Sequence, residues 1–393
     1  MRIVNVERLQ PGDTLGKSLF NERGELLLSS GFSLNEDMIR KIARQGYTFV
    51  YVMDEFTEDV KPQDVIDDTI RQQANAALAE QFKGCKDNLA FEKLAPEEIK
   101  RRLNEEDKVA NLIKMPSIRN QVTSILDEIV DNHVSMFTSL PMKADAGADY
   151  QHAIDTTVLS ILIAQKFRFD YRELKVMGTA CMLHDIGKMA FPKLAEKPPK
   201  ELTRDERMIL REHPVYSMKI LAGSSPDGFV EQAVVLQHHE RYDGQGYPQR
   251  MRSSTRPPNA PAPPQSGIMH RYAEILAVAN HYDNLLSGHI DGRKYEPAEA
   301  IIKVINEGGR MFNPHVVNAL TQVVQCYPVG ATVKIRKNAS GAYEGYVGVI
   351  KEANETDQSK PVIILLENTV GSAITPRVVD FSGERHMALE LLV

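Results

Sequence analysis

The 393-residue sequence has few cysteines and no excess of basic residues. Its three cysteines, Cys85, Cys181 and Cys326, are odd in number and lie far apart, so neither a disulfide framework nor a cysteine zinc site is expected. That pattern is typical of a reducing compartment, and we expect a cytoplasmic protein. The formal net charge is −6 and basic residues are interspersed with acids, which argues against a nucleic-acid polymer as a partner but allows a small anionic ligand.

Long hydrophobic runs are also lacking. Residues 1–9 alternate apolar and polar side chains and have no hydrophobic region of the kind that a signal peptide needs. The longest apolar stretch, residues 158–164, is far too short to cross a bilayer. We therefore expect neither export nor a membrane span.

The chain is longer than one ordinary hydrophobic core, which predicts a multidomain protein. Short apolar runs and glycines surround one helical pattern in residues 1–58, which predicts a small α+β domain. Residues 144–327 show one helical pattern after another, which predicts an all-α domain. Residues 328–393 predict a small β-rich domain with strands at 332–335, 346–350, 362–366 and 387–392.

Residues 59–143 are charged and helical in pattern, and we interpret them as a helical connector. Within them Ile118, Val122, Ile125 and Ile129 recur at three- and four-residue spacing, as on one face of an amphipathic helix. This apolar face is the surface through which we expect a homodimer.

Three local patterns mark boundaries inside the all-α domain. Thr203 and Glu206 form a capping box, in which a hydroxyl and a carboxylate bond reciprocally to free amides at a helix start. Asn313 followed by Pro314 marks another helix start. Residues 253–266 are rich in proline and serine, which predicts a loop.

Histidines are concentrated in this part of the chain. Six of the eleven lie between residues 133 and 239, and five of these fall on successive predicted helices rather than in a tag. Such spacing suits a site inside a helix bundle. His184 lies three and seven residues after Cys181 and Met177, so its ring belongs to an apolar face that packs inward.

A lone histidine on such a face is more often a satisfied core residue than a ligand. Here, however, His184-Asp185 and the tandem His238-His239 would bury several titratable groups together without lysine or arginine partners. That burial is costly unless a cation compensates for it, and a bound metal pair would do so. Imidazole and carboxylate ligands suit iron, manganese, zinc or nickel. A carboxylate that bridges two ions about 3.5–4 Å apart favours phosphoester hydrolysis.

Two further features lie close to these residues in sequence. Lys188 is one helical turn after His184, where its ammonium group would hold a phosphate oxygen beside the metals; a solvated surface lysine is the equally simple alternative. Residues 240–248 combine two glycines with an aromatic residue and a proline, which is typical of a turn facing a ligand or of a plain turn.

The motifs resemble those of the HD-GYP family of HD phosphohydrolases. The resemblance covers residues 145–327 and rests on His184-Asp185-Ile186-Gly187-Lys188, His213, His238-His239-Glu240 and Asp243-Gly244-Gln245-Gly246-Tyr247-Pro248. It implies an all-α, HD-type catalytic domain with a binuclear or trinuclear metal centre. It also implies a phosphodiesterase of bacterial second-messenger signalling, which hydrolyses cyclic di-GMP to linear pGpG, or onward to GMP, through a metal-activated hydroxide.

Carried over residue by residue, the family pattern implies two divalent transition-metal ions that share Asp185. The first ion would be held by His152, His184, Asp185 and the residue at position 280, which is Asn280. The second would be held by Asp185, His213, His238 and His239. Iron or manganese is the favoured metal, with zinc or nickel as alternatives.

The same pattern implies roles toward the substrate. Asp185 and Lys188 would be the catalytic residues. The substrate would be bound by Lys188, Tyr247 and Arg293. Glu296 stands where the family's Arg-Pro-Tyr-Lys motif has its lysine, so phosphate binding near Arg293 is weakened or altered.

Two further departures concern the metals. Ala148 stands one helical turn before His152, where members with three metals carry a glutamate, so two ions and mainly pGpG as product are expected. Asn280 replaces an aspartate ligand; its amide oxygen still coordinates a metal but adds no negative charge. Asp283, one turn later, is not expected to take over that role.

Two alternative functions are compatible with the sequence. Asn280 and Glu296 would also suit a degenerate HD-GYP protein that binds a cyclic dinucleotide, or docks a partner, without catalysis. Hydrolysis of the hybrid cyclic GMP–AMP would keep the chemistry and change only the base pocket.

Overall fold

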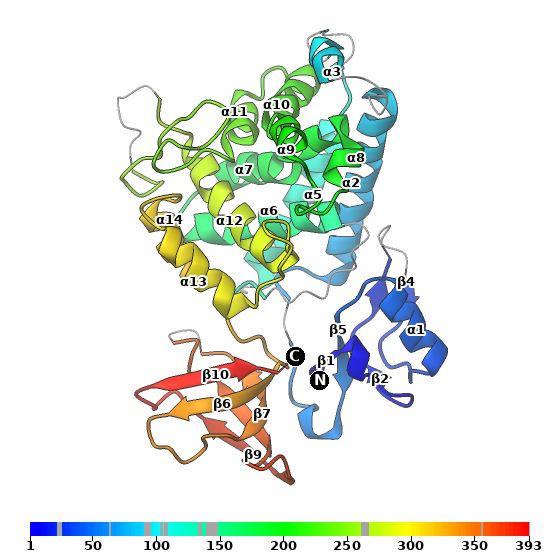
Figure 1. Ribbon diagram of the computed structural model, residues 1–393, viewed down its shortest axis with the longest axis vertical. Coiled ribbons are helices and arrows are strands. Elements are labelled where there is room, and N and C mark those ends of the chain that lie inside the picture. Colours follow the sequence, from blue (N-terminus) through cyan, green and yellow to red (C-terminus); the bar gives the residue numbers. More distant parts are fainter. Residues whose placement is uncertain are drawn as a thin grey trace.

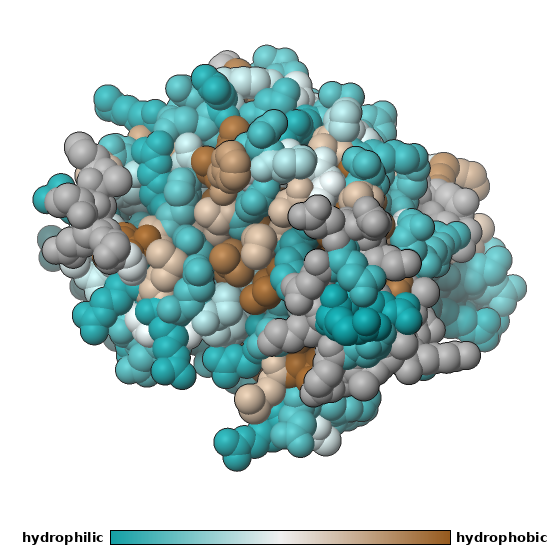
Figure 2. All heavy atoms as spheres, turned by 90° about the horizontal axis from the view of Figure 1, so that it is seen from above, coloured by the Kyte–Doolittle hydropathy of each residue, from teal (hydrophilic) through white to brown (hydrophobic). Residues whose placement is uncertain are grey.

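The computed structural model describes residues 1–21, 26–62, 64–89, 96–102, 105, 109–132, 136–138, 148–260, 267–354 and 357–392. The helices between residues 68 and 321 gather at one end of the molecule, and the N-terminal strands, with a short helix beside them, and the C-terminal strands lie side by side at the other (Figure 1). Viewed from the helical end, the surface is mostly hydrophilic, with apolar residues in small groups (Figure 2). Within the described ranges, no helix combines the length and apolar character that a bilayer span requires.

The N-terminal part is the expected small α+β unit. Its main sheet has the order β1-β5-β2, formed by β1 (Arg2–Asn5), β5 (Phe49–Met53) and β2 (Thr14–Leu15). A second ribbon pairs β3 (Leu19–Phe20) with β4 (Leu26–Leu28), and short 3-10 turns lie at η1 (Val6–Arg8) and η2 (Glu55–Thr57). Helix α1 (Glu36–Arg44) begins where the Asn35 side chain accepts a hydrogen bond from the Met38 amide.

The helical part contains the expected succession of helices. The first three are α2 (Asp68–Leu89), α3 (Pro96–Arg102) and α5 (Met115–Asn132). They are followed by α6 (Ala148–Lys166), α7 (Tyr171–Leu183), η3 (Ile186–Ala190), α8 (Pro192–Ala195), α9 (Arg204–Leu210), α10 (His213–Ser224), α11 (Phe229–Gln237), α12 (Arg271–Ser287), α13 (Pro297–Glu307) and α14 (Pro314–Thr321). Helix α6 packs against both α7 and α12, so it lies at the centre of this part.

The predicted connector is not a separate element between domains. The apolar side chains of α2 and α5 belong to the same hydrophobic core as those of α6 to α14. Ile118, Val122 and Ile125 are fully buried in that core, and Ile129 is nearly so. The apolar face of α5 is therefore occupied by the chain itself and is not available as a homodimer surface, whereas homodimer formation as such stays a prediction. Several parts of the connector lie outside the described residues: 63, 90–95, 103–104, 106–108, 133–135 and 139–143.

The local boundary predictions are confirmed. Helix α9 begins with the capping box of Thr203 and Glu206, and both of its reciprocal hydrogen bonds are present. Helix α14 begins with Asn313 as its cap and Pro314 as its first residue. The described part of the predicted loop, residues 253–260, contains neither helix nor strand, and residues 261–266 lie outside the described range. All three cysteines are free thiols.

The C-terminal part is a five-stranded antiparallel sheet with the order β10-β6-β7-β8-β9. Four strands match the sequence prediction: β6 (Thr332–Asn338), β7 (Val347–Glu352), β8 (Val362–Glu367) and β10 (Met387–Leu391). The prediction missed β9 (Ala373–Asp380). This strand lies at the edge of the sheet, is largely exposed and contains Pro376, so it lacks the apolar alternation that identifies a strand.

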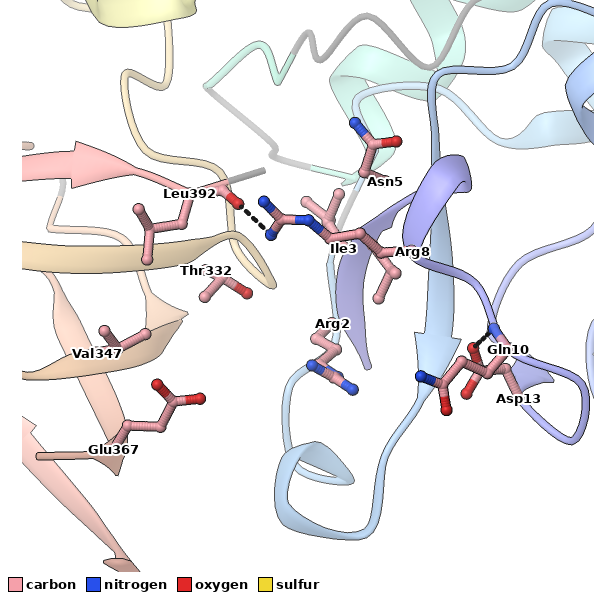
Figure 3. Close-up of a pocket in the computed structure, with 11 residues that line it drawn as sticks. Arg2, Ile3, Asn5, Arg8, Gln10, Asp13, Thr332, Val347, Glu367 and Leu392 are labelled. Atoms are coloured by element: carbon pink, nitrogen blue, oxygen red, sulfur yellow. Dashed lines mark hydrogen bonds between the residues drawn. The ribbon is translucent and has the colours of Figure 1, made fainter. Parts of the chain in front are cut away.

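The two terminal parts share one hydrophobic core. Ile3 and Tyr51 from the N-terminal sheet pack in one cluster with Val333 and Ile335 from the C-terminal sheet. The Ile3 amide also donates a hydrogen bond of 2.8 Å to the Gly330 carbonyl. A cavity of about 380 Å³ opens at this junction, lined from both sides by residues that include Arg2, Arg8, Thr332 and Glu367 (Figure 3). The two ends of the chain thus form a joint unit.

Because Ile125 is fully buried on α5, we expect Ile125→Ala to lower the free energy of unfolding of the helical part by about 2–5 kcal/mol. Val130 lies on the same helix but is 48% exposed, so Val130→Ala should change this free energy by no more than about 0.5 kcal/mol. Denaturant titration followed by helical circular dichroism measures both. Equal effects of the two substitutions would contradict the placement of α5 in the core.

Candidate metal centre

The ends of three helices and the side of a fourth bring together one carboxylate and five imidazoles. His152 lies on α6, His184 and Asp185 follow α7, His213 opens α10, and His238 and His239 follow α11. These six are among the residues predicted from the sequence as metal ligands. His239 is half-buried and the other five are buried.

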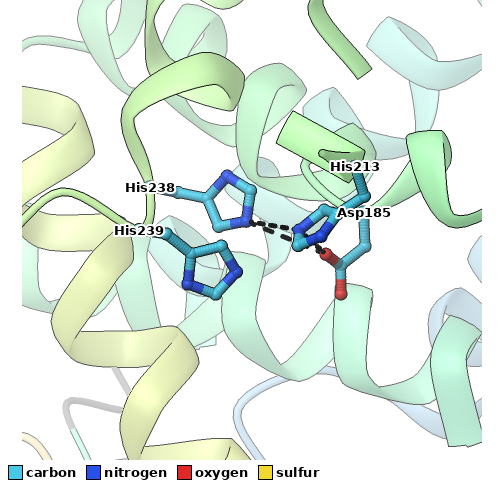
Figure 4. A group of neighbouring side chains, drawn as sticks. All are labelled: Asp185, His213, His238 and His239. Atoms are coloured by element: carbon cyan, nitrogen blue, oxygen red, sulfur yellow. Dashed lines mark hydrogen bonds and ion pairs between the residues drawn. The ribbon is translucent and has the colours of Figure 1, made fainter. Parts of the chain in front are cut away.

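Asp185 is shared by the two halves of the cluster, and Figure 4 shows it beside His213 in the half that also contains His238 and His239. Its Oδ1 is 3.1 Å from His213 Nε2 and 3.8 Å from His238 Nε2. Its Oδ2 is 3.4 Å from His184 Nε2 and 3.7 Å from His152 Nε2. Each carboxylate oxygen therefore faces a different pair of imidazoles, which is the arrangement of a bridging ligand.

The helix ends orient three of these rings. The Nδ1–H groups of His184, His213 and His238 each donate a 2.7 Å hydrogen bond to the backbone carbonyl three residues earlier. Those carbonyls lie in the last turns of α7, α9 and α11, where helix carbonyls lack partners within the helix. The bonds place the proton on Nδ1 and leave the Nε2 lone pair facing Asp185, as in metal-binding histidines.

His152 is oriented by a carboxylate instead. Its Nδ1 is 2.6 Å from Asp283 Oδ2 on α12, and both side chains are buried. Because the carboxylate is an acceptor, Nδ1 carries the proton and the Nε2 lone pair faces inward. Asp283 was not assigned to the site from the sequence. The signal that would have suggested it is its position three residues after Asn280, on the same face of the helix.

The inward-facing nitrogen atoms lack the partners that a metal-free core would need. His152 Nε2 and His184 Nε2 have no hydrogen-bond partner among the described residues. His213 Nε2 lies 3.2 Å from His238 Nε2, although both rings carry their proton on Nδ1. Burial, reinforced by the neighbouring histidines, keeps the pKa of His238 well below its usual value, so a shared proton does not resolve this contact. A cation held by the two rings would resolve it.

The protonation states of the cluster also match those that metal binding requires. Burial by itself would raise the pKa of Asp185, but His184 and the Lys188 ammonium group hold it well below the usual range. Lys188 Nζ lies 2.5 Å from Asp185 Oδ2. Burial also lowers the pKa of His239. The carboxylate is thus ionised and the imidazoles of His238 and His239 are neutral near pH 7, which are the forms that bind metals.

The ligand atoms fall into two groups that share Asp185. One group contains Asp185, His213, His238 and His239, and the other contains His152, His184 and Asp185. Within each group the ligand atoms lie within 4.8 Å of one another. Nitrogen and carboxylate donors without a thiolate suit two first-row transition-metal ions.

A close helix contact fixes Asp185 and Lys188 relative to His213. Gly187, between them, lies so near α10 that an added Cβ would be 2.2 Å from the His213 carbonyl oxygen. The Gly187 amide donates to Ser217 Oγ, which in turn donates to the His184 carbonyl. The glycine of the His184–Lys188 motif is therefore required by packing.

The segment after the tandem histidines folds back over the site. The Glu240 carboxylate is buried and accepts hydrogen bonds from the amides of Gln249 and Met251, at 2.6 and 2.9 Å. This brings Tyr247 onto His239, with ring centroids 4.7 Å apart and planes 16° from parallel. Tyr247 therefore lies beside the group of ligands around Asp185 and His213.

Two residues predicted from the sequence have other hydrogen-bond partners in the structure. Arg293 is exposed, and its guanidinium group pairs with Glu299 through two 2.9 Å hydrogen bonds. Asn280 is buried on α12, but its Oδ1 accepts a 2.5 Å hydrogen bond from Asn284, and the contact from α12 to His152 comes from Asp283 instead. The side chain of Ala148 lies outside the described part of the chain.

Comparisons with known proteins identify a family and relatives that this chain resembles. A family model described as HD domain matches residues 124–316. The chain is 30% identical to a cyclic di-GMP phosphodiesterase of Pseudomonas aeruginosa over 67% of this chain and 56% of that protein. It is 32% identical to a cyclic di-GMP phosphodiesterase response regulator of Xanthomonas campestris over 40% of this chain and 39% of that protein. The chain thus spans about half or less of the length of these relatives.

A solved structure, described as an HDG"Y"P protein from Bdellovibrio bacteriovorus, aligns with 81% of this chain and 97% of its own. Its sequence identity is 15% and its TM-score 0.42.

Because an added Cβ at Gly187 meets backbone atoms, we expect Gly187→Ala to push η3 away from α10, to destabilise the fold by about 1–3 kcal/mol and to weaken metal retention. Gly84 lies on α2 with open space around it, so Gly84→Ala should retain metal and be neutral or slightly stabilising. Metal analysis after dialysis, together with the unfolding midpoint, measures both. Full metal retention by the Gly187 variant would contradict the packing argument.

Proposed function

Because this chain belongs to the HD-GYP family of HD-domain proteins, we propose that it is a metal-dependent phosphodiesterase that hydrolyses cyclic di-GMP. The observation that carries the proposal is the pair of ligand groups that share the Asp185 carboxylate inside the matched HD domain. The relatives support the substrate, since they are described as cyclic di-GMP phosphodiesterases. A nucleic-acid polymer is not part of the proposed function.

In the proposed centre His152, His184 and Asp185 hold the first ion, and Asp185, His213, His238 and His239 hold the second. Two ions in such a site lower the pKa of water and neutralise charge on a phosphodiester. Asp283 keeps the His152 lone pair directed inward, and the carbonyls of Cys181, Leu210 and Val235 do so for three other rings. Iron or manganese is the proposed metal.

Lys188 and Tyr247 are the proposed substrate contacts. The Lys188 ammonium group is partly exposed beside Asp185, so it reaches both the carboxylate and a phosphate oxygen placed next to it. Tyr247 offers an aromatic edge next to His239. Phosphate binding by Arg293 stays a prediction from the family resemblance, and it would require opening of the ion pair with Glu299.

The proposed product is linear pGpG, because Ala148 offers no third carboxylate ligand. We expect the chain loaded with Fe²⁺ or Mn²⁺ to cleave cyclic di-GMP faster than hybrid cyclic GMP–AMP and to accumulate pGpG, as measured by chromatography of the nucleotides.

Asp185→Asn should remove both metal equivalents and reduce turnover at least about 10²-fold, since it removes the shared negative charge.

Asp87→Asn, at an exposed position on α2, is the matched control and should retain both properties. Tight binding of cyclic di-GMP without any turnover would favour the degenerate, nucleotide-binding alternative. Preferential cleavage of the hybrid nucleotide would instead assign the chain to that substrate.

Asn280 stays a proposed ligand of the first ion. If it is one, Asn280→Asp adds a negative charge to a cationic site and should slow metal loss to a chelator severalfold. Asn306→Asp, an exposed change of the same charge on α13, serves as the control. Unchanged metal retention would show that Asn280 only accepts the hydrogen bond from Asn284.

A further inference from the structure

Arg211 lies next to the cluster but has no role in the proposed centre. It caps the C-terminal end of α9, two residues before His213 opens α10. Its backbone amide is bonded to the Arg207 carbonyl, so the start of the side chain is fixed by the helix end. The side chain is exposed and therefore reaches the entrance of the site rather than its interior.

The Arg211 guanidinium group lies over the ring of Tyr247, which is a proposed substrate contact. Its Cζ lies 4.3 Å from the centroid of the Tyr247 ring, and Tyr247 in turn stacks on His239. The Tyr247 ring thus contacts both the Arg211 cation and His239, a proposed metal ligand. A contact between a cation and an aromatic ring occupies no carboxylate or carbonyl acceptor, so it leaves N–H donors of the guanidinium group available.

No carboxylate neutralises this cation. Among the described residues, Arg211 forms neither an ion pair nor a side-chain hydrogen bond, and its contact is the aromatic ring of Tyr247. Arg293 differs, because its guanidinium group donates hydrogen bonds to both oxygen atoms of the Glu299 carboxylate. Lys188 is held by Asp185 beside the metals. Arg211 is therefore the arginine near the centre with donors to offer an anion.

A cyclic dinucleotide carries two phosphodiesters in one ring. When one of them lies at the metals, the other must lie outside them, where an unpaired anion is costly to desolvate. We propose that Arg211 binds this second, uncleaved phosphodiester through a bidentate contact and so selects for cyclic dinucleotides over substrates with one phosphate. This inference rests on the proposed function, because it takes a cyclic dinucleotide as the substrate.

The test compares two substrates. Arg211→Ala should raise the KM for cyclic di-GMP about ten- to hundredfold with little change in kcat, as expected for loss of a charged hydrogen bond. The KM for bis(p-nitrophenyl) phosphate, which has one phosphate, should stay unchanged. Equilibrium binding of a phosphorothioate analogue of cyclic di-GMP should weaken by the same factor, and metal content should not change.

Two variants separate charge from packing. Arg211→Gln keeps a planar end group over Tyr247 without the charge and should behave like the alanine variant, whereas Arg211→Lys should fall between that variant and the wild type. Arg204→Ala, at an exposed position two turns earlier on α9, is the charge-matched control and should leave both KM values unchanged.

The inference is overturned if Arg211→Gln retains the wild-type KM, because the role is then packing, or if the KM for both substrates rises equally, because the contact is then with the cleaved phosphate. Failure of the wild-type protein to bind or cleave cyclic di-GMP would instead refute the proposed function itself, and the inference with it.

Discussion

The sharing of one ionised carboxylate among buried imidazoles is the interaction on which the centre depends. Asp185 carries the negative charge at the middle of the cluster, and each of its oxygens faces a pair of Nε2 atoms. Five buried or half-buried rings around one carboxylate would be a poor core by themselves, since several nitrogen lone pairs face one another or no donor at all. Cations at the two groups of ligands would turn this unfavourable arrangement into a favourable one.

The helical architecture supplies the orientation that such a centre needs. Carbonyls three residues before His184, His213 and His238 accept the Nδ1 protons, and Asp283 does the same for His152. The close approach of η3 to α10 at Gly187 then sets the distance between the two halves of the site. The ligands are therefore held by rigid backbone geometry, which preorganises them without further side-chain ordering.

Two further regions of the molecule differ in how they relate to this centre. The segment with Tyr247 is anchored by Glu240 and covers one side of the centre. The two ends of the chain form a joint unit around Ile3, Tyr51 and Ile335, at the opposite end from the helices. The helices α2 and α5, which were interpreted as a connector, belong to the hydrophobic core of the helical part itself, because their apolar faces complete it.

The sequence by itself determined the family, the order of the three parts and the residues that gather around Asp185. It did so because the histidine motifs, the capping box at Thr203 and the apolar periodicity are local patterns, each visible within a few residues. Tertiary structure alone decided the partner of each of these residues. Asp283 rather than Asn280 contacts His152, Arg293 pairs with Glu299, Arg211 stacks on Tyr247, and β9 pairs with β8 without an apolar pattern of its own. These contacts join residues on different elements, and their geometry depends on how whole helices and strands pack, which no local pattern records.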